Sequence, residues 1–469
     1  MPLVAGVDSS TSATKVEVRD LDTGDVVGRG GAPHPPTQPP RSEQDPAAWW
    51  AAFESAWSQA GAPDVAAISV AGQQHGMVAL DERLDVIRAA KLWNDTESAP
   101  DAAWLIDQLA GGRKAWADAC GSVPVASFTI TKLSWLHRSQ PEAWARLAHV
   151  VLPHDWLTHR LTGRLTTDRG DASGTGYWSA ATGSYRFDLL AIVDGDRDWS
   201  GVVPEVLGPH DTAGEWNGAQ VGPGTGDNMA GALGVGLRSG DVAISIGTSG
   251  TVYSVCDEPT ADASGYVAGF ADATGRQLPL VCTLNATKVT DAVGRLVGAG
   301  HEELDALALA TPPGAGGLTL LPYLDGERTP DRPSATGVLA GIRSDVGRGQ
   351  LARAAVEGVI CGLLDGLDAL AAFAPADGRL ILVGGGARSQ AYRHVLADLS
   401  GRAVLVPRGE EQVATGACVQ AAAVVTGAEP ADVADRWNLG GGEVVEPGPG
   451  SAAAADVRAA YAAVRDAST

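Results

Sequence analysis

The first residues of this chain that could do chemistry lie close to its N-terminus. An apolar run, Leu3–Val7, ends in Asp8, and small or hydroxylated residues follow up to Thr14, before alternation resumes at Lys15. This pattern predicts a strand, a tight turn and a second strand. Small residues let a phosphate approach backbone N–H groups, and an aspartate at the turn can hold a hydrated cation. The turn is a candidate phosphate clamp, with Asp8 as a metal ligand and with donors from Ser10, Thr11, Ser12 and Lys15.

A second segment of the same design lies near the middle of the chain. Asp241–Val255 reads DVAISIGTSGTVYSV, which is an apolar strand, a turn and another apolar strand. One hairpin with a Ser/Thr-rich turn is most often only a hairpin, but two copies indicate two related domains whose turns face one nucleotide from opposite sides. The arrangement resembles the superfamily of actin, hexokinase and the heat-shock chaperones. A P-loop enzyme is excluded, because the chain has no GxxxxGK[ST] sequence and only five lysines. The candidate phosphate-binding residues of the second turn are Gly247, Thr248 and Ser249.

Two further apolar runs in the first half end in polar side chains that suit a polyol. The run Val65–Val70 leads to Gln74 and His75, and a later run leads to Trp93 and Asp95. An indole face can cover the C–H groups of a sugar while amide, imidazole and carboxylate groups bond its hydroxyls. Polar residues at the end of a buried strand also stand where α/β folds bind their ligands. Each group could equally belong to an ordinary turn, because His in a turn is commonly structural.

A glycine-rich loop, Gly222–Gly226, leads to Asp227 and Asn228 at the start of a helix of small residues. By spacing alone, Asp227 is an N-cap residue, which is the commonest use of aspartate at such a place. The alternative is a general base that accepts the proton of a hydroxyl group during phosphoryl transfer, with Asn228 beside it to hold the sugar.

Two other polar segments are candidates for ligand contact. The strand predicted over Arg379–Val383 is followed by a glycine turn that opens a helix, so a ligand could lie against the backbone there. Its place after two phosphate turns favours an adenosine pocket, with candidate residues Gly385, Gly386 and Arg388. Asp168–Ser173 reads as a polar loop, capable of cation or phosphate contact but just as often a solvated crossing.

The composition limits the class of partner. The chain has 469 residues, enough for two domains with full cores, and a formal net charge of −22 that argues against binding nucleic acid or an anionic membrane. Its five cysteines are widely spaced without ligand spacing, so we expect reduced, largely buried thiols. We expect a cytoplasmic protein, because no secretory signal pattern and no apolar run of transmembrane length occurs.

Together these segments resemble the FGGY family of carbohydrate kinases over essentially the whole chain. Two long stretches carry most of this resemblance: SFTITKLSWLHR at Ser127–Arg138 and GVLAGIRSDVGRGQLARAAVE at Gly337–Glu357. Within the family, the xylulokinase branch is the most similar, by the motifs GQQHG (72–76), WND (93–95), DASGT (171–175), GDN (226–228) and NATKVTDA (285–292). The usual motif of that branch has Met before the histidine, where this chain has Gln74.

The resemblance implies a two-domain, actin-like ATPase fold of the ribonuclease H-like type. Each domain would hold a central mixed β-sheet flanked by helices, with the active site in the cleft between the domains. Residues 1–236 would bind the sugar and carry the first phosphate turn and the catalytic aspartate, and residues 237–469 would bind adenosine. The implied reaction is ATP- and Mg²⁺-dependent phosphorylation of the terminal hydroxyl of D-xylulose, with Asp227 as general base and also as a metal ligand beside Asp8. The sugar-binding residues would be Gln74, His75, Trp93, Asp95, Asp227 and Asn228, and family members commonly form homodimers.

Three alternatives stay open from the sequence. A ribulokinase or glycerol kinase type would share the phosphate turns and differ in its sugar. An actin-like nucleotide switch would keep both turns but need no polyol pocket. A sugar-sensing regulator would carry an added DNA-binding domain, for which no segment precedes Leu3.

Overall fold

The computed structural model describes residues 2–38 and 40–468, and the chain packs as two compact units. The first unit comprises the chain up to Leu237 together with Cys256–Leu278 and Glu411–Gly440, and the second comprises Arg238–Val255, Pro279–Glu410 and the chain from Gly441 onward. The expected division was a single cut, into residues 1–236 and 237–469. The packing differs from it, because two segments from the C-terminal half belong to the first unit.

The first unit is built on a mixed sheet of order β13-β14-β5-β1-β2-β3, with β15 also paired to β5. Strand β1 pairs antiparallel with β2 and parallel with β5, which confirms the first expected hairpin, with Ser9 opposite Thr14 at its turn. The strands of this sheet are β1 (Leu3–Ser9), β2 (Ala13–Asp20), β3 (Val26–Pro33), β5 (Ala67–Gly72), β13 (Gly214–Trp216), β14 (Ala219–Val221) and β15 (Thr225–Gly226).

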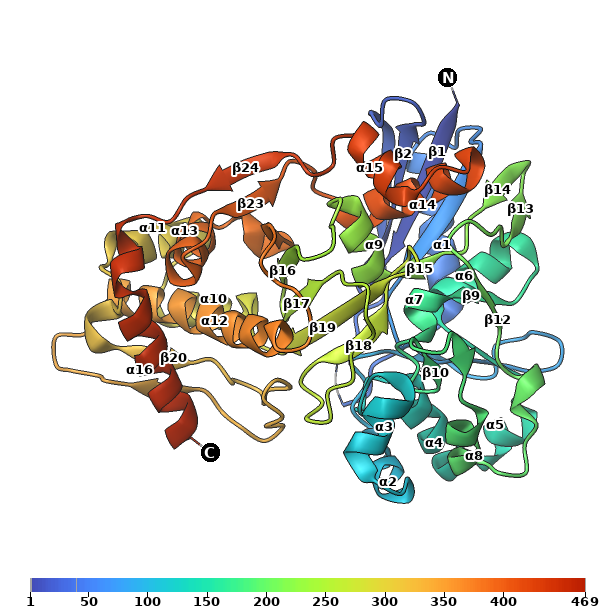
Figure 1. The fold of residues 1–469 in the computed structure, drawn as a ribbon, viewed down its shortest axis with the longest axis horizontal. Coiled ribbons are helices and arrows are strands. Elements are labelled where there is room, and N and C mark those ends of the chain that lie inside the picture. Colours follow the sequence, from blue (N-terminus) through green and yellow to red (C-terminus); the bar gives the residue numbers. More distant parts are fainter. Residues whose placement is uncertain (1, 39, 469) are drawn as a thin grey trace. The chain divides into compact units, whose positions relative to one another are not determined.

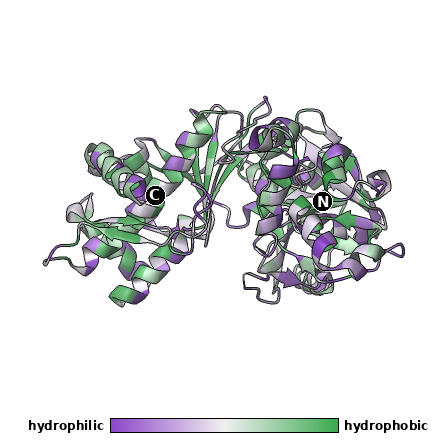
Figure 2. Ribbon diagram, turned by 90° about the horizontal axis from the view of Figure 1, so that it is seen from below, coloured by the Kyte–Doolittle hydropathy of each residue, from purple (hydrophilic) through white to green (hydrophobic). Residues whose placement is uncertain are grey.

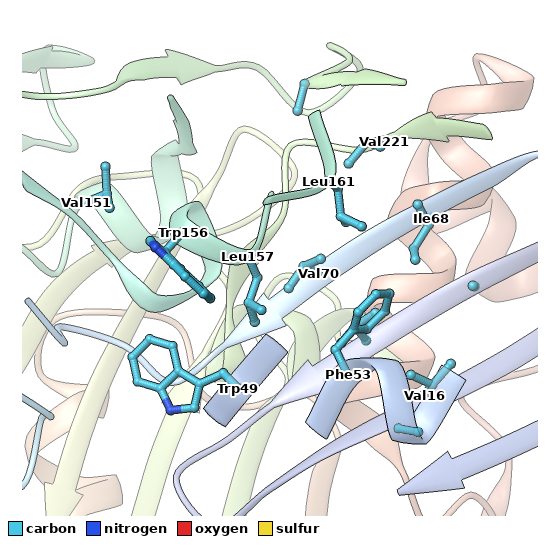
Figure 3. Packing of buried hydrophobic residues seen from close by; sticks show 14 of the residues in the cluster. Val16, Trp49, Phe53, Ile68, Val70, Val151, Trp156, Leu157, Leu161 and Val221 are labelled. Carbon is cyan, nitrogen blue, oxygen red and sulfur yellow. The ribbon is translucent and has the colours of Figure 1, made fainter. Parts of the chain in front are cut away.

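Helices cover both faces of this sheet. On one face, α1 (Pro46–Gln59) and α6 (Pro153–Thr162) bury an aromatic core against the strands, in which the rings of Trp49 and Trp156 meet edge to face at 6.2 Å (Figure 3). Helix α1 starts where its sequence favours a start, because the Asp45 side chain accepts a hydrogen bond from Ala47 N and Pro46 opens the helix. The apolar stripe of α1 is core.

The other face is covered by α14 (Gln412–Thr426), which explains why a late segment belongs to the first unit. A Cβ atom at Gly6 would lie 2.0 Å from the carbonyl oxygen of Ala414, so the helix lies directly on β1 (Figure 1). Val4, Cys418 and Val419 share one buried cluster on this face. The helix is held by apolar packing of small residues at close approach.

The second unit has its own mixed sheet, in which β17, β16, β22, β23 and β24 are neighbours in that order. Strand β16 pairs antiparallel with β17 and parallel with β22, so the second expected hairpin is also confirmed. The long helix α12 packs against β17, and α13 packs against β23. The elements are β16 (Val242–Ile246), β17 (Gly250–Ser254), β19 (Gln277–Thr283), β20 (Thr319–Leu321), β21 (Val338–Ala340), β22 (Leu380–Val383), β23 (Val404–Pro407), β24 (Gly442–Val445), α10 (Thr287–Val297), α11 (His301–Ala310), α12 (Arg348–Ala371), α13 (Gln390–Ser400) and α16 (Ala454–Ala467), with short 3₁₀ turns η2 (Ala315–Gly317), η3 (Gly385–Arg388) and η4 (Pro449–Ala453).

The remaining elements of the first unit surround the ends of its strands. They are β4 (Glu43–Gln44), β6 (Val78–Leu80), β7 (Ala90–Lys91), β8 (His149–Val151), β9 (Thr166–Asp168), β10 (Trp178–Ser179), β11 (Ser184–Tyr185), β12 (Glu205–Leu207), β18 (Ala268–Ala271), α2 (Ala99–Gln108), α3 (Gly112–Cys120), α4 (Thr129–Ser139), α5 (Pro141–Arg146), α7 (Arg169–Ala172), α8 (Phe187–Val193), α9 (Asp227–Gly234), α15 (Pro430–Arg436) and the 3₁₀ turn η1 (Trp199–Gly201).

One expected loop has a different structure. The segment Asp168–Ser173 is the end of β9 followed by helix α7, and the side chains of Asp168 and Asp171 are buried. The expectation of a solvated crossing was wrong, because these carboxylates have partners inside the unit.

The distribution of apolar residues fits these two cores. Strands of the sheets are largely coloured as hydrophobic in Figure 2. The five cysteines are free and buried, as expected. Within residues 2–38 and 40–468, no helix is both long and apolar enough to cross a membrane.

Candidate functional site

The first turn presents Asp8 at the end of β1. This carboxylate is only 5% exposed and accepts a hydrogen bond from the Ser10 hydroxyl. Burial raises its pKa to about 6, although the Ser10 hydrogen bond and the Lys15 charge act in the opposite direction. Lys15 is half-exposed and its Nζ lies 2.6 Å from Glu411 Oε2. Ser12 is exposed at the tip of the turn.

The turn is also tied to the segments expected to bind the sugar. The hydroxyl of Thr11 donates to Gln73 Oε1 at 3.2 Å and accepts from the indole Nε1 of Trp93 at 2.8 Å. Gln44 fixes the backbone of the turn by donating to Thr11 O at 3.1 Å. Thr11 was expected to be a phosphate donor, but its hydroxyl is already hydrogen-bonded to Gln73 and Trp93, which belong to the segments expected to bind the sugar.

Three of the expected sugar-site residues form one hydrogen-bonded group. Asn228 Nδ2 donates to Gln74 Oε1 at 2.8 Å and lies 3.0 Å from Asp227 Oδ1. The side chain of Gln74 is 4% exposed, and its Nε2 has no hydrogen-bond partner among the residues that the structure describes. Because a buried amide donor without a partner is costly, this group is poised for an oxygen atom of a ligand.

Asp227 is the first residue of α9, and Gly226 is the N-cap. Burial, together with the negative charges of Asp8 and Asp171, raises the pKa of Asp227 to about 7. Two carboxylates of which one disfavours the charged form of the other fit a divalent cation, because oxygen ligands of this kind are what Mg²⁺ prefers. Asp8 and Asp227 are therefore a chemically suitable pair for the implied magnesium ion.

His75 lies at the tight turn after β5 with a φ of +66°, which is rare for a residue with a side chain. Its carbonyl accepts a hydrogen bond from the Thr129 hydroxyl at 3.2 Å. Its ring lies 5.0 Å from that of Phe128 and 5.4 Å from that of Phe270. Such a costly backbone conformation persists only where the surroundings hold it, and it is typical of functional sites.

Asp95 lies in a different environment from the one expected for a sugar ligand. Its carboxylate is fully buried, accepts hydrogen bonds from Ser42 N and Glu97 N, and lies 2.8 Å from Lys91 Nζ. The same ammonium group lies 2.6 Å from Glu97 and 3.2 Å from Glu43, and 3.9 Å from the centre of the Trp135 ring. The three carboxylates could together ligate a metal, but Lys91 supplies the cation. Through these contacts, Asp95 holds in place the backbone that directly follows Trp93 and Asn94.

Replacing Lys91 with methionine is expected to lower the free energy of unfolding by about 3–5 kcal/mol, because it leaves buried carboxylates without their cation. Denaturant unfolding followed by tryptophan fluorescence measures this loss. The matched control is Lys114→Met, whose ion pair with Asp118 lies on the surface and is worth less than about 1 kcal/mol. Equal losses in the two variants would show that the Lys91 cluster does not stabilise the first unit.

The second unit brings its expected phosphate and adenosine residues together. Thr248 O and Gly247 O accept hydrogen bonds from Ala286 N and Thr287 N, so the second turn is fastened to the start of α10. A Cβ at Gly386 would lie 2.3 Å from Ile246, the residue before that turn, so η3 lies directly beside it. Gly385 is exposed, and Arg388 is exposed 3.5 Å from Glu410.

A cavity of about 450 Å³ lies beside α10 in this unit. Sequence reasoning did not find it, although its wall includes residues of the NATKVTDA motif. In that wall the Thr290 hydroxyl lies 3.1 Å from the Tyr392 hydroxyl, and Asp291 Oδ1 lies 3.6 Å from His301 Nδ1. The cavity is lined by Thr290, Asp291, Gly294, Arg295, Gly298, Ala299, Gly300, His301 and Leu304.

Comparison with known proteins gives the chain's relatives. Residues 3–234 match the N-terminal domain of the FGGY family of carbohydrate kinases, and residues 242–425 match its C-terminal domain. Xylulose kinase of Streptomyces coelicolor is 49% identical over 95% of this chain and 92% of the relative, and that of Escherichia coli is 35% identical over 85% and 84%. The crystal structure of xylulose kinase from Bifidobacterium adolescentis superposes with a TM-score of 0.86 at 42% identity, covering 99% of each chain. These matches confirm the resemblance and the expected fold class of mixed sheets flanked by helices. The chain belongs to the FGGY family of carbohydrate kinases.

Proposed function

We propose that this chain transfers the γ-phosphoryl group of ATP to the terminal hydroxyl of D-xylulose, which gives D-xylulose 5-phosphate and ADP. The observation that carries the proposal is the hydrogen-bonded group of Gln74, Asn228 and Asp227, in a chain 49% identical to a xylulose kinase. An actin-like nucleotide switch would have no use for such a group. The 49% identity to a xylulose kinase likewise disfavours the ribulokinase and glycerol kinase types.

In the proposed reaction, Asp227 accepts the proton of the sugar's terminal hydroxyl as that oxygen attacks the phosphoryl group. Asn228 holds the carboxylate through its 3.0 Å contact and keeps it turned toward the sugar. Asp8 and Asp227 would hold magnesium, which when bound offsets the negative charge of the phosphates. A carboxylate with a raised pKa suits a base, because it binds a proton firmly enough to accept one.

The other expected site residues receive the following roles. The backbone of the second turn, at Gly247, Thr248 and Ser249, binds phosphate oxygens, as do the exposed donors of the first turn. Gly385, Gly386 and Arg388 bind the adenosine side, and the cavity beside α10 has the volume of a nucleoside site. The packing of η3 against the residue before the second turn supports the assignment of both segments to one nucleotide.

Gln74 bears on the choice of sugar. Its carbonyl oxygen is engaged by Asn228, which leaves Nε2 as a donor. A methionine at this place would offer only contact, whereas an amide donor left unpaired disfavours a sugar that lacks the matching oxygen. We propose that Gln74 donates to an oxygen of the ketose.

Purified protein is expected to release ADP from ATP when D-xylulose and Mg²⁺ are both present, because the reaction needs the sugar's hydroxyl as acceptor. A coupled assay across xylulose, ribulose, glycerol and gluconate measures the rates, with EDTA as the metal control. Activity on xylulose no higher than on the other sugars would contradict the substrate assignment. ADP release that is independent of any sugar would favour the nucleotide-switch alternative.

The family resemblance also supports a homodimer that acts in the cytoplasm, and both are part of the proposal. Light scattering on the purified protein tests the dimer.

A further inference from the structure

The first unit contains a buried group of one imidazole and three carboxylates close to the turn that carries Gln74 and His75. His154 and Asp155 come from α6, Asp168 ends β9, and Asp171 lies in α7, and none of the four side chains is more than 2% exposed. His154 Nδ1 lies 2.8 Å from Asp171 Oδ2, and its Nε2 lies 3.1 Å from Asp155 Oδ1. The proposed reaction assigns no role to this group.

His154 carries the positive charge that this group needs. Burial alone would lower the pKa of His154, but the carboxylates of Asp155, Asp171 and Asp168 raise it to about 9. Burial raises the pKa of Asp155 to about 6, and the charge of His154 opposes that rise. His154 bridges α6 and α7 through the hydrogen bond from its Nδ1 to Asp171, while its Nε2 lies within ion-pair distance of Asp155 without a hydrogen bond among the described residues.

One side of this group reaches His75. The backbone of His75 favours the charged form of Asp171 and so acts against burial, which raises the pKa of that carboxylate. The ring of His75 rests on Gly174, where a Cβ would lie 2.4 Å from its Nδ1 and Cε1. The unusual backbone conformation of His75 is therefore held from the α7 side, and Asp171 is itself held by His154.

The other side reaches the segment before Asp227. A Cβ at Gly224, which has a φ of +78°, would lie 2.4 Å from Cδ2 of the His154 ring. Asp168 Oδ2 accepts a hydrogen bond from the Thr225 hydroxyl at 2.7 Å, two residues before Asp227. The buried group thus touches both the sugar-binding turn and the strand that leads to the base.

We propose that His154 is a positioning residue for phosphoryl transfer: bonded to Asp171 and packed on Gly224, it holds His75 and the approach to Asp227 in their working geometry. This inference rests on the proposed function. A displacement of about 1 Å at His75 or at the strand before Asp227 would lower the rate of sugar phosphorylation by about a hundredfold. All four residues of this group belong to the first unit. A substitution in the group is therefore expected to change KM for the sugar rather than KM for MgATP.

The test compares His154→Gln, which removes the charge, with His154→Lys, which retains one. The glutamine variant is expected to raise KM for D-xylulose at least about tenfold and to lower kcat, with KM for MgATP within about twofold of wild type. The lysine variant is expected to recover most of the sugar affinity. Leu157→Ala is the control, because it opens the core on the same helix without touching this group.

Asp171→Asn is the second variant, and it carries the test if the glutamine variant does not fold. It weakens the link between His154 and His75 and also removes one of the charges that raise the pKa of Asp227. Its effect on positioning is expected as a higher KM for the sugar, as in the glutamine variant. Wild-type KM values in either folded variant would overturn the inference, as would a change no larger than that of Leu157→Ala. A wild-type enzyme without ketose kinase activity would instead contradict the proposed function.

Discussion

Replacing Asp227 with alanine is expected to lower kcat by about a hundredfold or more while D-xylulose binding largely survives. The carboxylate would be the group that accepts the hydroxyl proton, and no neighbouring side chain in its hydrogen-bonded group can take that role. Asn228 and Gln74 are amides, which do not bind protons near neutral pH. Turnover by the coupled assay and sugar affinity by calorimetry measure the two effects separately.

The stability of the same variant distinguishes a base from a helix cap. An N-cap aspartate would stabilise α9, so its loss would cost about 1 kcal/mol. The structure instead places Gly226 at the N-cap, without a side-chain capping bond. The folded pKa of Asp227 is raised from 3.8 to about 7, so this carboxylate lowers the stability of the folded state as pH rises from about 4 to 7, and the loss is complete above pH 7. In metal-free buffer at pH 8, the melting temperature of Asp227→Ala is therefore expected to equal or exceed that of wild type. A lower melting temperature with near-normal kcat would place the base elsewhere.

The parts of this fold that were predictable are those whose signal is local. Each phosphate hairpin is one apolar run, one turn of small residues and a second apolar run, so pairing within it follows from neighbouring residues. The start of α1 was equally readable, since Asp45 and Pro46 form a cap and a first-turn proline. Such signals need no knowledge of distant partners.

The parts that were not predictable depend on partners far away in the chain. Helix α14 is made mostly of small apolar residues, so its sequence indicates burial but not the unit in which it is buried. The helix lies on Gly6, and nothing in the sequence around Gly6 shows that a helix packs against this glycine. For this reason the expected cut at residue 236 did not describe the packing.

The same reason limits what the sequence says of the site. Gln74, Asp227 and Asn228 were expected in one site, and the structure brings their side chains into contact. Asp95 was expected to be a sugar ligand because it lies beside Trp93 in a polar motif, but its carboxylate forms an ion pair with the buried Lys91. A charged residue in a polar motif does not show by itself whether it faces a ligand or a buried counter-ion.

Replacing Asp8 with asparagine is expected to lower kcat/KM for MgATP by about a hundredfold and to raise the Mg²⁺ concentration needed for half-maximal rate. The substitution keeps the size of the side chain and removes one of the two negative charges proposed to hold the ion. A bound metal contributes several kcal/mol to phosphoryl transfer, and 2.7 kcal/mol corresponds to about a hundredfold in rate. D-xylulose affinity without nucleotide is expected to change little, because the hydrogen-bond partner of Asp8 is Ser10, whereas Gln74 and Asp227 are hydrogen-bonded to Asn228.

The control for Asp8 is Glu411→Gln. Glu411 is the other carboxylate whose negative charge raises the pKa of Asp8, and it pairs with Lys15 rather than lying at the end of β1. If Asp8 acts only through the net charge near the turn, both variants should change the Mg²⁺ dependence alike. If Asp8 is a ligand, the glutamine control should stay within about threefold of wild type, since a partly exposed ion pair is worth less than about 1 kcal/mol. An unchanged Mg²⁺ requirement in Asp8→Asn would mean that other residues hold the ion, and Asp227 would then act as a base alone.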